Sequence, residues 1–289
     1  MAKQRQTENR ESSGKETNAK QTNGEEANGS VETQSNRGVD YANQLLFAFR
    51  RYYLLQDAAG QFGWREETVR RTIPASQIAI IVCDMWDAHW SRGASARVDA
   101  MAPVMNEVLK AARAKGIRII HAPSETMNEY ADTPARRRMR AAPYISPPTE
   151  GERESPPLPI DDSDGGSDTG EPDWHKAWTR QHPALEIDQN VDGISDNGQE
   201  IYNYVQQHEI RQVLIMGVHT NMCILNRSFG IKQLVKWGVN VALVRDLTDA
   251  MYNPAKPPYV DHDTGTQLVI GYIERFWCPT VTSDVIVEK

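Results

Sequence analysis

The stretch "QIAIIVCDMW", residues 77–86, contains an unbroken run of apolar residues, Ile78 to Cys83, that leads directly into the acidic Asp84. A run of this kind is typical of a β-strand buried on both faces, as in a parallel sheet. The following residues place apolar side chains at helical spacing (Met101, Val104, Met105, Val108, Leu109 and Ala112). This spacing predicts an amphipathic helix, and Gly116 is a suitable residue to end it.

The alternation of strand and helix continues along the chain. We expect strands at "IRIIHAP" (117–123), "ALEID" (184–188), "QVLIMGV" (212–218), "NVALVRD" (240–246) and near "PTVTSDVIV" (279–287), with helices through 197–210, from Cys223 to Gly238 and through 265–277. Such alternation predicts an α/β fold in which two helical layers cover a mostly parallel sheet of roughly six strands. We assign this domain to residues 75–289, and residues 39–74 are predicted to form a β-hairpin extension ahead of it.

Two polar segments interrupt the pattern. Residues 1–38 consist almost wholly of polar residues and glycine, so we expect a disordered tail that cannot bury enough apolar surface to fold. Residues 142–173 are rich in Pro, Asp and Gly and are either a linker or an insertion next to a site. Within them "DDSDGGSD" (161–168) suggests calcium but lacks the EF-hand spacing, so Asx-turns are the preferred interpretation.

The charge and the cysteines narrow the function classes. A net charge of −7 offers no attraction for nucleic acid or for an anionic membrane surface. The three cysteines have no C-x-x-C spacing, which argues against a cysteine-based metal site and against a disulfide framework. We find no signal peptide or membrane-spanning segment. The sequence therefore predicts a cytoplasmic protein that acts on a small molecule.

Reactive side chains follow three of the expected strands. The first strand ends in "CDMWDAHW" (83–90), the second in His121 and "PSETM" (123–127), and the fourth in "GVHTNMC" (217–223). In an open parallel sheet, ligands bind beyond the carboxyl ends of the strands. No G-x-G-x-x-G or Walker sequence follows any strand, so no nucleotide cofactor is predicted.

Cys223 is the residue best placed for chemistry. It lies in the first turn of an expected helix, with Thr220 or Asn221 as N-cap, where the helix dipole would lower the thiol pKa. Free backbone N–H groups at that point would stabilise an oxyanion, and Asp84 from the neighbouring strand end would accept the thiol proton. The alternative is an inert cysteine of the core.

The stretches "IAIIVCDMWD" and "VLIMGVHTNMCILNRSFGIKQLVKWGVNVALVRDLTDAM" resemble the isochorismatase-like cysteine hydrolases, which include nicotinamidases. The resemblance covers roughly residues 75–285. It implies that Asp84 is the general base, that Cys223 is the nucleophile, and that the peptide bond between Val218 and His219 is cis and helps to aim the oxyanion donors.

Two features depart from that family. Its third catalytic residue is a lysine after the third strand, where this chain has Asp188, Gln189 and Asn190. Either Lys176 or Arg180 folds back to replace it, or the site relies on the helix dipole alone, or activity is lost. The nicotinamidase metal motif D-x-H is also missing after the second strand, so no metal is predicted.

The resemblance and the strand ends together suggest the substrate contacts. We expect them from Trp86, Asp87, His89, Trp90, His219 and Asn221, with hydrogen bonding favoured over a metal on Asp87, His89 and His219. Arg227 is placed either to bind a substrate carboxylate or to face solvent.

The sequence thus predicts hydrolysis of a small amide or related C–N bond through a Cys223 thioester, with Asp84 as general acid and base. The alternative is a catalytically silent binding or regulatory protein on the same fold, because the lysine is missing. Similar proteins are often oligomeric, so we expect a homo-oligomer.

Overall fold

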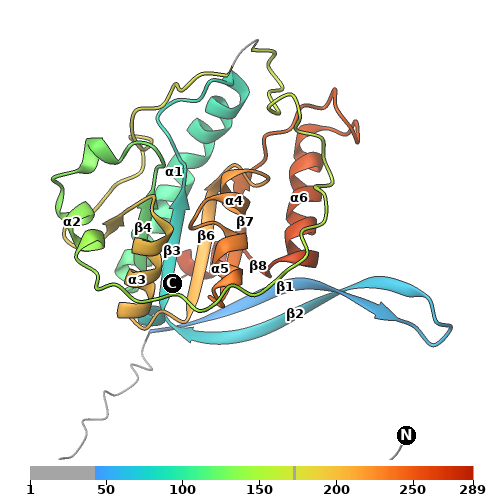
Figure 1. Ribbon diagram of the computed structural model, residues 1–289, viewed down its shortest axis with the longest axis horizontal. Helices are drawn as coiled ribbons and strands as arrows, with labels where there is room; N and C mark the ends of the chain where they lie inside the picture. The colour runs from blue at the N-terminus through green and yellow to red at the C-terminus, as the bar shows by residue number, and fades with distance from the viewer. Residues whose placement is uncertain (1–42, 172–173, 289) are drawn as a thin grey trace, which may run out of the picture. The chain divides into compact units, whose positions relative to one another are not determined.

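The computed structural model describes residues 43–171 and 174–288. The predicted tail, 1–38, and the first residues of the hairpin extension lie outside the described residues. In the described part, eight strands form one sheet in the order β2-β1-β8-β7-β6-β3-β4-β5 (Figure 1). The strands are β1 (Gln44–Gln56), β2 (Phe62–Pro74), β3 (Ile78–Cys83), β4 (Arg118–Ala122), β5 (Gly193–Ile194), β6 (Gln212–Val218), β7 (Val241–Asp249) and β8 (Thr280–Val281).

Six of these strands, β3 to β8, run parallel to one another. Strand β1 pairs antiparallel with β8 at Arg50 and Thr280, and β2 pairs antiparallel with β1 along its full length. The hairpin therefore continues the sheet at one edge. The predicted α/β fold, with a mostly parallel six-stranded sheet and an N-terminal hairpin, is confirmed.

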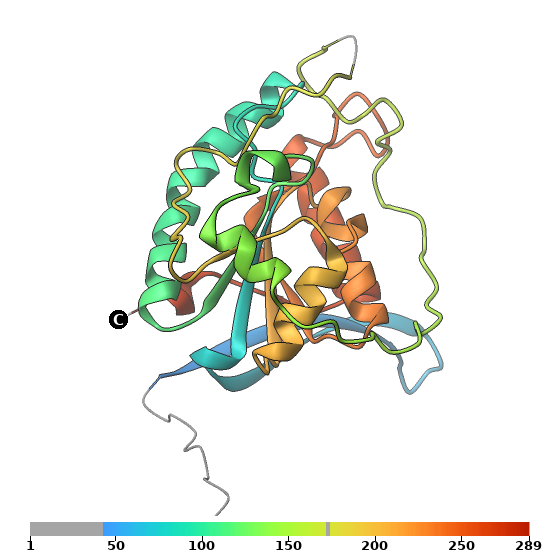
Figure 2. The same ribbon diagram turned by 60° about the vertical axis from the view of Figure 1, so that its left-hand side comes forward.

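Helices cover both faces of the parallel strands (Figure 2). They are α1 (Arg92–Ala114), α2 (Pro134–Arg140), α3 (Gly198–Gln207), α4 (Cys223–Asn226), α5 (Ile231–Lys236), α6 (His262–Phe276) and α7 (Asp284–Val287), with short 3₁₀ turns at Ala75–Gln77 and Met127–Tyr130. Alternate residues of β3 point to opposite faces. Ile80 packs in the core formed with α1, whereas Ile81 packs in the core formed with α3, α5 and α6. The apolar run is buried on both faces, as its sequence predicts.

The predicted strand at 184–188 is wrong. These residues form a turn and an irregular segment, and the third parallel strand is the two-residue β5 further along the chain. Backbone groups of the segment are already engaged elsewhere: Leu185 N–H donates to the His182 carbonyl at 3.0 Å and Glu186 N–H to the Asn106 side chain at 2.9 Å. Leu185 is buried without any strand pairing. Burial of one leucine thus explains the apolar signal that suggested a strand.

The predicted single helix from Cys223 to Gly238 is also wrong. Helix α4 ends after one turn, the chain becomes extended at Arg227, and α5 begins at Ile231. At Gly230, which lies between the two helices, an added Cβ would come within 2.9 Å of the Ile224 carbonyl oxygen. The close turn therefore requires glycine at this position.

The Pro-, Asp- and Gly-rich segment is an insertion, since it has no helix or strand between 143 and 171 yet is hydrogen-bonded to the domain. Arg153 Nε donates to the Phe276 carbonyl at 3.1 Å, and the Tyr272 hydroxyl donates to the Pro156 carbonyl at 2.7 Å. Further on, the side chains of Asp161 and Asp164 each accept a hydrogen bond from the backbone N–H two residues later. These are the Asx-turns that the sequence predicts.

In the described part of the chain, no helix is both long enough and apolar enough to cross a bilayer. All three cysteines are free thiols, and Cys83 and Cys278 are buried. A cytoplasmic location stays a prediction.

We predict that Gly217→Ala strongly destabilises the fold. Gly217 has a φ of 114°, and an added Cβ would lie 2.1 Å from the backbone carbonyl oxygen of Cys83 on the neighbouring strand. We expect a loss of about 3 kcal/mol or more in the free energy of unfolding, measured by urea denaturation. Gly116→Ala is the matched control, because Gly116 also has positive φ but no atom lies within 4 Å of its added Cβ. The control should lose about 1 kcal/mol, and equal losses would contradict the argument.

Candidate active site

Asp84 occupies the centre of the site, directly after β3. Its side chain is fully buried and its φ is 45°, a left-handed conformation that aspartate tolerates better than most residues. One carboxylate oxygen accepts the backbone N–H of Ser124 at 2.7 Å, and the other accepts Nε of Arg227 at 2.9 Å. Burial raises the pKa of the Asp84 carboxyl, and the Arg227 guanidinium opposes that rise.

Cys223 is the first residue of α4, and its thiol lies close enough to Asp84 for each group to shift the pKa of the other. Burial, followed by the negative charge of Asp84, raises the pKa of the Cys223 thiol, whereas Arg227 and a backbone hydrogen bond from His219 favour the thiolate. The resting site therefore holds a neutral thiol beside a carboxylate. A single proton links the two groups, and its transfer to Asp84 would create the thiolate.

The predicted effect of the helix dipole is wrong. Helix α4 has only one turn, its N-cap is Met222, and no side chain caps it. Thr220 and Asn221, the predicted caps, are engaged elsewhere: Thr220 bonds to the Thr248 hydroxyl at 2.7 Å and the Asn221 amide to Asp162 at 2.8 Å. The groups that favour the thiolate are instead the Arg227 side chain and the His219 backbone.

Arg227 supplies the cation that the sequence appeared to lack. Its guanidinium contacts Asp84, and it reaches Glu125 at 3.4 Å on the solvent side. Neither predicted substitute is in place, since Lys176 donates to the Glu125 carbonyl at 2.7 Å and Arg180 lies 3.9 Å from Asp87. The useful signal in the sequence was the spacing of four residues between Cys223 and Arg227, which brings both onto one side of a helical turn.

An aromatic pocket of about 220 Å³ opens beside the cysteine. Its lining is Trp86, His89, Trp90, Glu125, Gly165, Trp174, Trp178, His219, Met222, Cys223, Arg227 and Met251. Trp86 and Trp178 stack with ring centroids 4.2 Å apart and an angle of 10° between their planes. Trp174 and Trp178 belong to a stretch after the insertion that sequence reasoning did not connect with the site. The pocket offers flat, apolar surfaces next to Cys223.

The two histidines of the pocket are neutral. Burial lowers the pKa of His219 to about 3 and that of His89 to about 4. Nδ1 of His89 accepts the backbone N–H of Ser91 at 3.1 Å, which leaves Nε2 to carry the proton. Nε2 of His219 is buried and has no hydrogen-bond partner in the described residues. The bond between Val218 and His219 is cis.

Two of the predicted substrate contacts are not part of the pocket lining. The Asp87 carboxylate accepts hydrogen bonds from the backbone and hydroxyl of Thr179 at 2.9 and 2.6 Å. The Asn221 side chain donates to Asp162 and to the Met251 carbonyl and accepts the Met251 N–H at 2.9 Å. Both residues hold loops together. The four other predicted contacts, Trp86, His89, Trp90 and His219, do line the pocket.

Metal-binding side chains are not gathered at the site. Among the described residues, no group of three or more His, Cys, Asp or Glu side chains is arranged to hold a metal ion. His121, at the end of β4, is buried between Gln181 at 3.0 Å and Asp192 at 3.1 Å. Asp192 in turn accepts a hydrogen bond from Arg113 at 2.7 Å, so His121 is part of a buried hydrogen-bond network.

Part of the insertion forms one wall of the pocket. Gly165 lies against Trp90, and an added Cβ on Gly166 would come within 2.4 Å of the Met251 carbonyl oxygen. Beyond these glycines Asp168 forms an ion pair with Arg97 at 2.7 Å. The insertion is therefore fixed against the site by both close packing and charge.

A comparison with protein families matches residues 78–256 to the isochorismatase domain. The chain belongs to the isochorismatase family. The matched range contains Asp84, Cys223 and Arg227, so the site lies within the family domain. Membership of this family indicates that the chain is a hydrolase.

Solved structures with a similar arrangement are distant in sequence. A cysteine hydrolase from Pseudomonas syringae pv. phaseolicola 1448A is 17% identical, with a TM-score of 0.47 over 74% of this chain and 92% of its own. An isochorismatase family protein from Burkholderia thailandensis is 14% identical, with a TM-score of 0.43 over 74% and 97%. An N-carbamoylsarcosine amidase from Thermoplasma acidophilum is 12% identical, with a TM-score of 0.37 over 72% and 97%. No curated protein matches the sequence.

We predict that Arg227→Met raises the apparent pKa of the Cys223 thiol by about one unit or more, because it removes the positive charge that opposes burial. The rate of alkylation by iodoacetamide, followed from pH 7 to pH 10, reports the fraction of thiolate, so the Met variant should react about tenfold more slowly across this range. Arg227→Lys should stay close to the wild-type profile, since it keeps the charge, and Cys223→Ser identifies any alkylation elsewhere. Identical profiles for the Met variant and the wild type would show that Arg227 does not act on the thiol.

We predict that His219 makes the fold sensitive to acid. The unfolded chain takes up a proton on this histidine near its ordinary pKa of 6.5, whereas the folded chain resists protonation down to a pKa of about 3. Stability is therefore lost as the pH falls below about 6.5. Between pH 7 and pH 5 the wild type should lose about 2 kcal/mol more than His219→Gln in urea denaturation.

An equal loss in the wild type and in His219→Gln would mean that the buried imidazole is not the group responsible.

Proposed function

We propose that this chain is a cysteine hydrolase that cleaves a small-molecule amide, or a related C–N bond, through a thioester on Cys223. The observation that carries the proposal is the contact series from the Cys223 thiol to the Asp84 carboxylate and on to the Arg227 guanidinium at 2.9 Å, beside an aromatic pocket. Nucleophile, base and cation are the parts that thiol-based acyl transfer requires.

The first half of the reaction forms the thioester. Asp84 accepts the thiol proton as Sγ of Cys223 attacks the carbonyl carbon, and the carbonyl oxygen becomes an oxyanion. Among the described residues, no group accepts a hydrogen bond from the backbone N–H of Cys223, so this N–H is available to the oxyanion. The C–N bond then breaks, and the proton on Asp84 passes to the leaving nitrogen, which departs as ammonia or an amine.

The second half releases the acid. A water molecule gives a proton to Asp84 and adds to the thioester carbon. The C–S bond breaks, the proton on Asp84 returns to Cys223, and the product leaves as a carboxylic acid. Asp84 thus serves twice as base and twice as acid, and the raised pKa of its carboxyl suits both roles better than that of an exposed aspartate.

Arg227 contributes electrostatics to this cycle. It stabilises the negative charge whether that charge lies on Asp84 or on the sulfur, because it is close enough to lower the pKa of both groups. The alternative of a catalytically silent binding protein rested on a missing cation. The contact between the Arg227 guanidinium and Asp84 supports the hydrolase over that alternative.

The pocket favours a small substrate with a flat apolar part. A volume of about 220 Å³ suits a molecule smaller than an ordinary drug. The stacked pair of Trp86 and Trp178 presents an aromatic face to it. His89 and His219, both neutral, are suited to form hydrogen bonds with uncharged polar groups.

We predict that Cys223→Ala lowers the turnover of a responsive amide by about 10³-fold or more, because no other thiol lines the pocket. Wild-type protein is first tested against a panel of small amides, with ammonia release as the signal and mass spectrometry to detect an acyl adduct on Cys223. Cys278→Ala is the control, since Cys278 is buried outside the pocket. Undiminished turnover by the Cys223 variant would end this mechanism.

A further inference from the structure

The β1–β2 hairpin carries an unusual amount of exposed apolar surface. More than half of the large hydrophobic side chains that are exposed in the described residues belong to it: Leu46, Tyr53, Leu54, Leu55, Phe62, Trp64 and Val69. Figure 1 shows the hairpin crossing beneath the parallel strands, with its turn extending beyond them. Concentrated exposed apolar surface of this kind marks interaction sites.

The outer edge of β2 has no strand beside it in the described part of the chain. The register of the hairpin shows which backbone N–H and C=O groups of β2 point to this open edge. The pair Asn43 and Ala75 and the pair Asp57 and Gln61 are hydrogen-bonded, and both fit the same antiparallel register as the hairpin. Because such pairs alternate, the odd-numbered residues of β2 bond to β1. The even-numbered residues from Trp64 to Thr72 therefore direct their N–H and C=O groups to the open edge.

The charges along β2 are ordered in a way that suits a second copy of the same strand. Residues 66–71 read "EETVRR", two acids followed by two bases. Neither Glu67 nor Arg70 nor Arg71 forms an ion pair with another described residue, and all three are exposed. In an antiparallel pair of identical strands, the acidic half of one strand meets the basic half of the other.

Two-fold symmetry restricts the registers. When a two-fold axis relates two identical edge strands, residues opposite one another have their side chains on the same face of the sheet. Their residue numbers are therefore both odd or both even. It follows that one residue at the centre lies opposite its own copy. With Val69 at the centre, Glu67 opposes Arg71 of the partner and no like charges are opposed. With Thr68 at the centre, Arg65 would oppose Arg71. Centres at Glu67 or Arg70 would place each of these residues opposite itself.

We propose that two copies of the chain associate through their β2 edges, antiparallel and centred on Val69, so that the two sheets become continuous. In this register the even-numbered residues of each strand form the hydrogen-bonded pairs, for example Thr68 with Arg70 of the partner, which matches the open N–H and C=O groups. Trp64 comes opposite Pro74 of the partner, so the apolar end of each hairpin reaches the base of the other.

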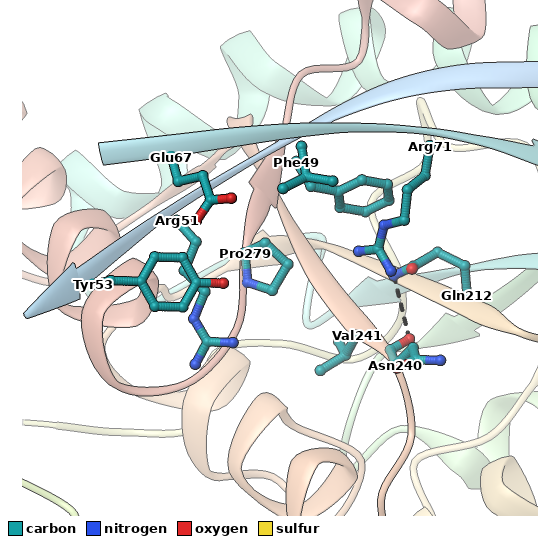
Figure 3. A pocket seen from close by; sticks show the side chains of 10 residues that line it. Phe49, Arg51, Tyr53, Glu67, Arg71, Gln212, Asn240, Val241 and Pro279 are labelled. Carbon is teal, nitrogen blue, oxygen red and sulfur yellow. Dashed lines mark hydrogen bonds between the residues drawn. The ribbon is translucent and has the colours of Figure 1, made fainter. Parts of the chain in front are cut away.

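The side chains that would pair are accessible. Figure 3 shows Glu67 and Arg71 extending from β2 over an open cavity of about 340 Å³, which lies between the hairpin and the first residues of β6 and β7. Arg71 lies over the Phe49 ring at 4.2 Å. Val69 is 41% exposed. The proposed contact therefore requires no unfolding of the hairpin.

Sedimentation velocity of the full chain at micromolar concentration tests the association. We expect a species of twice the chain mass. Glu67→Arg should weaken the association by about tenfold or more, because two like-charged pairs replace two opposite ones in each dimer. The exchange Glu67→Arg with Arg71→Glu restores opposite charges and should restore the dimer. A monomeric wild type, or a double variant as weak as the single one, would overturn the proposal.

Cysteine cross-linking tests the register. In a background of Cys223→Ser, Val69→Cys should form an interchain disulfide under mild oxidation, because a self-opposed non-hydrogen-bonded pair brings the two Cα atoms to about 4.5 Å. Thr68→Cys is the matched control and should cross-link poorly, since its partner is Arg70. Preferential cross-linking through Thr68 would contradict the register.

A backbone variant separates strand pairing from other modes of association. Thr68→Pro removes one N–H that points to the open edge and leaves the bonds to β1 intact, so the fold should survive by circular dichroism while the dimer dissociates. A folded Thr68→Pro protein that remains dimeric would show that the two copies associate through something other than the β2 edge. That result would overturn the proposal.

Discussion

A buried carboxylate is the constraint around which this site is built. Asp84 is wholly inaccessible, and the transfer of an isolated carboxylate from water to such an environment costs several kcal/mol. The cost is offset by the Ser124 N–H, the Arg227 guanidinium and the Cys223 thiol. These partners come from the end of β4 and from the region of α4. Satisfying one carboxylate therefore brings three separate segments together at the carboxyl edge of the sheet.

The sequence predicts the parts of this arrangement that depend on local signals. The apolar run before Asp84 indicates a buried strand, and parallel strands place their carboxyl ends at a common edge. That rule alone brings the ends of β3 and β6 together and suggests that Asp84 meets Cys223. The two-residue β5 was missed because a strand of that length leaves no periodic pattern.

Arg227 was not predicted as the cation, because the family's lysine follows the third strand, whereas Arg227 follows the fourth. Residues 223–238 have the apolar spacing of one continuous helix, but α4 ends after one turn. The actual break reflects the close approach of Gly230 to the backbone of the preceding turn, a tertiary feature with no local pattern. Asp87 and Asn221 lie outside the pocket lining for a related reason. Their hydrogen-bond partners, Thr179 and Met251, are distant in sequence and compete with any substrate for the polar side chains.

Asn221 joins the loop that precedes Cys223 to the insertion, because its side-chain amide contacts both Asp162 and the backbone of Met251. The insertion has no helix or strand of its own between 143 and 171, so its length and composition can vary without changing the sheet. A change in this segment thus alters one wall of the pocket while Cys223, Asp84 and Arg227 keep their positions. The strand ends and the turns that follow them hold the reactive side chains, whereas a segment outside the core shapes the space beside them.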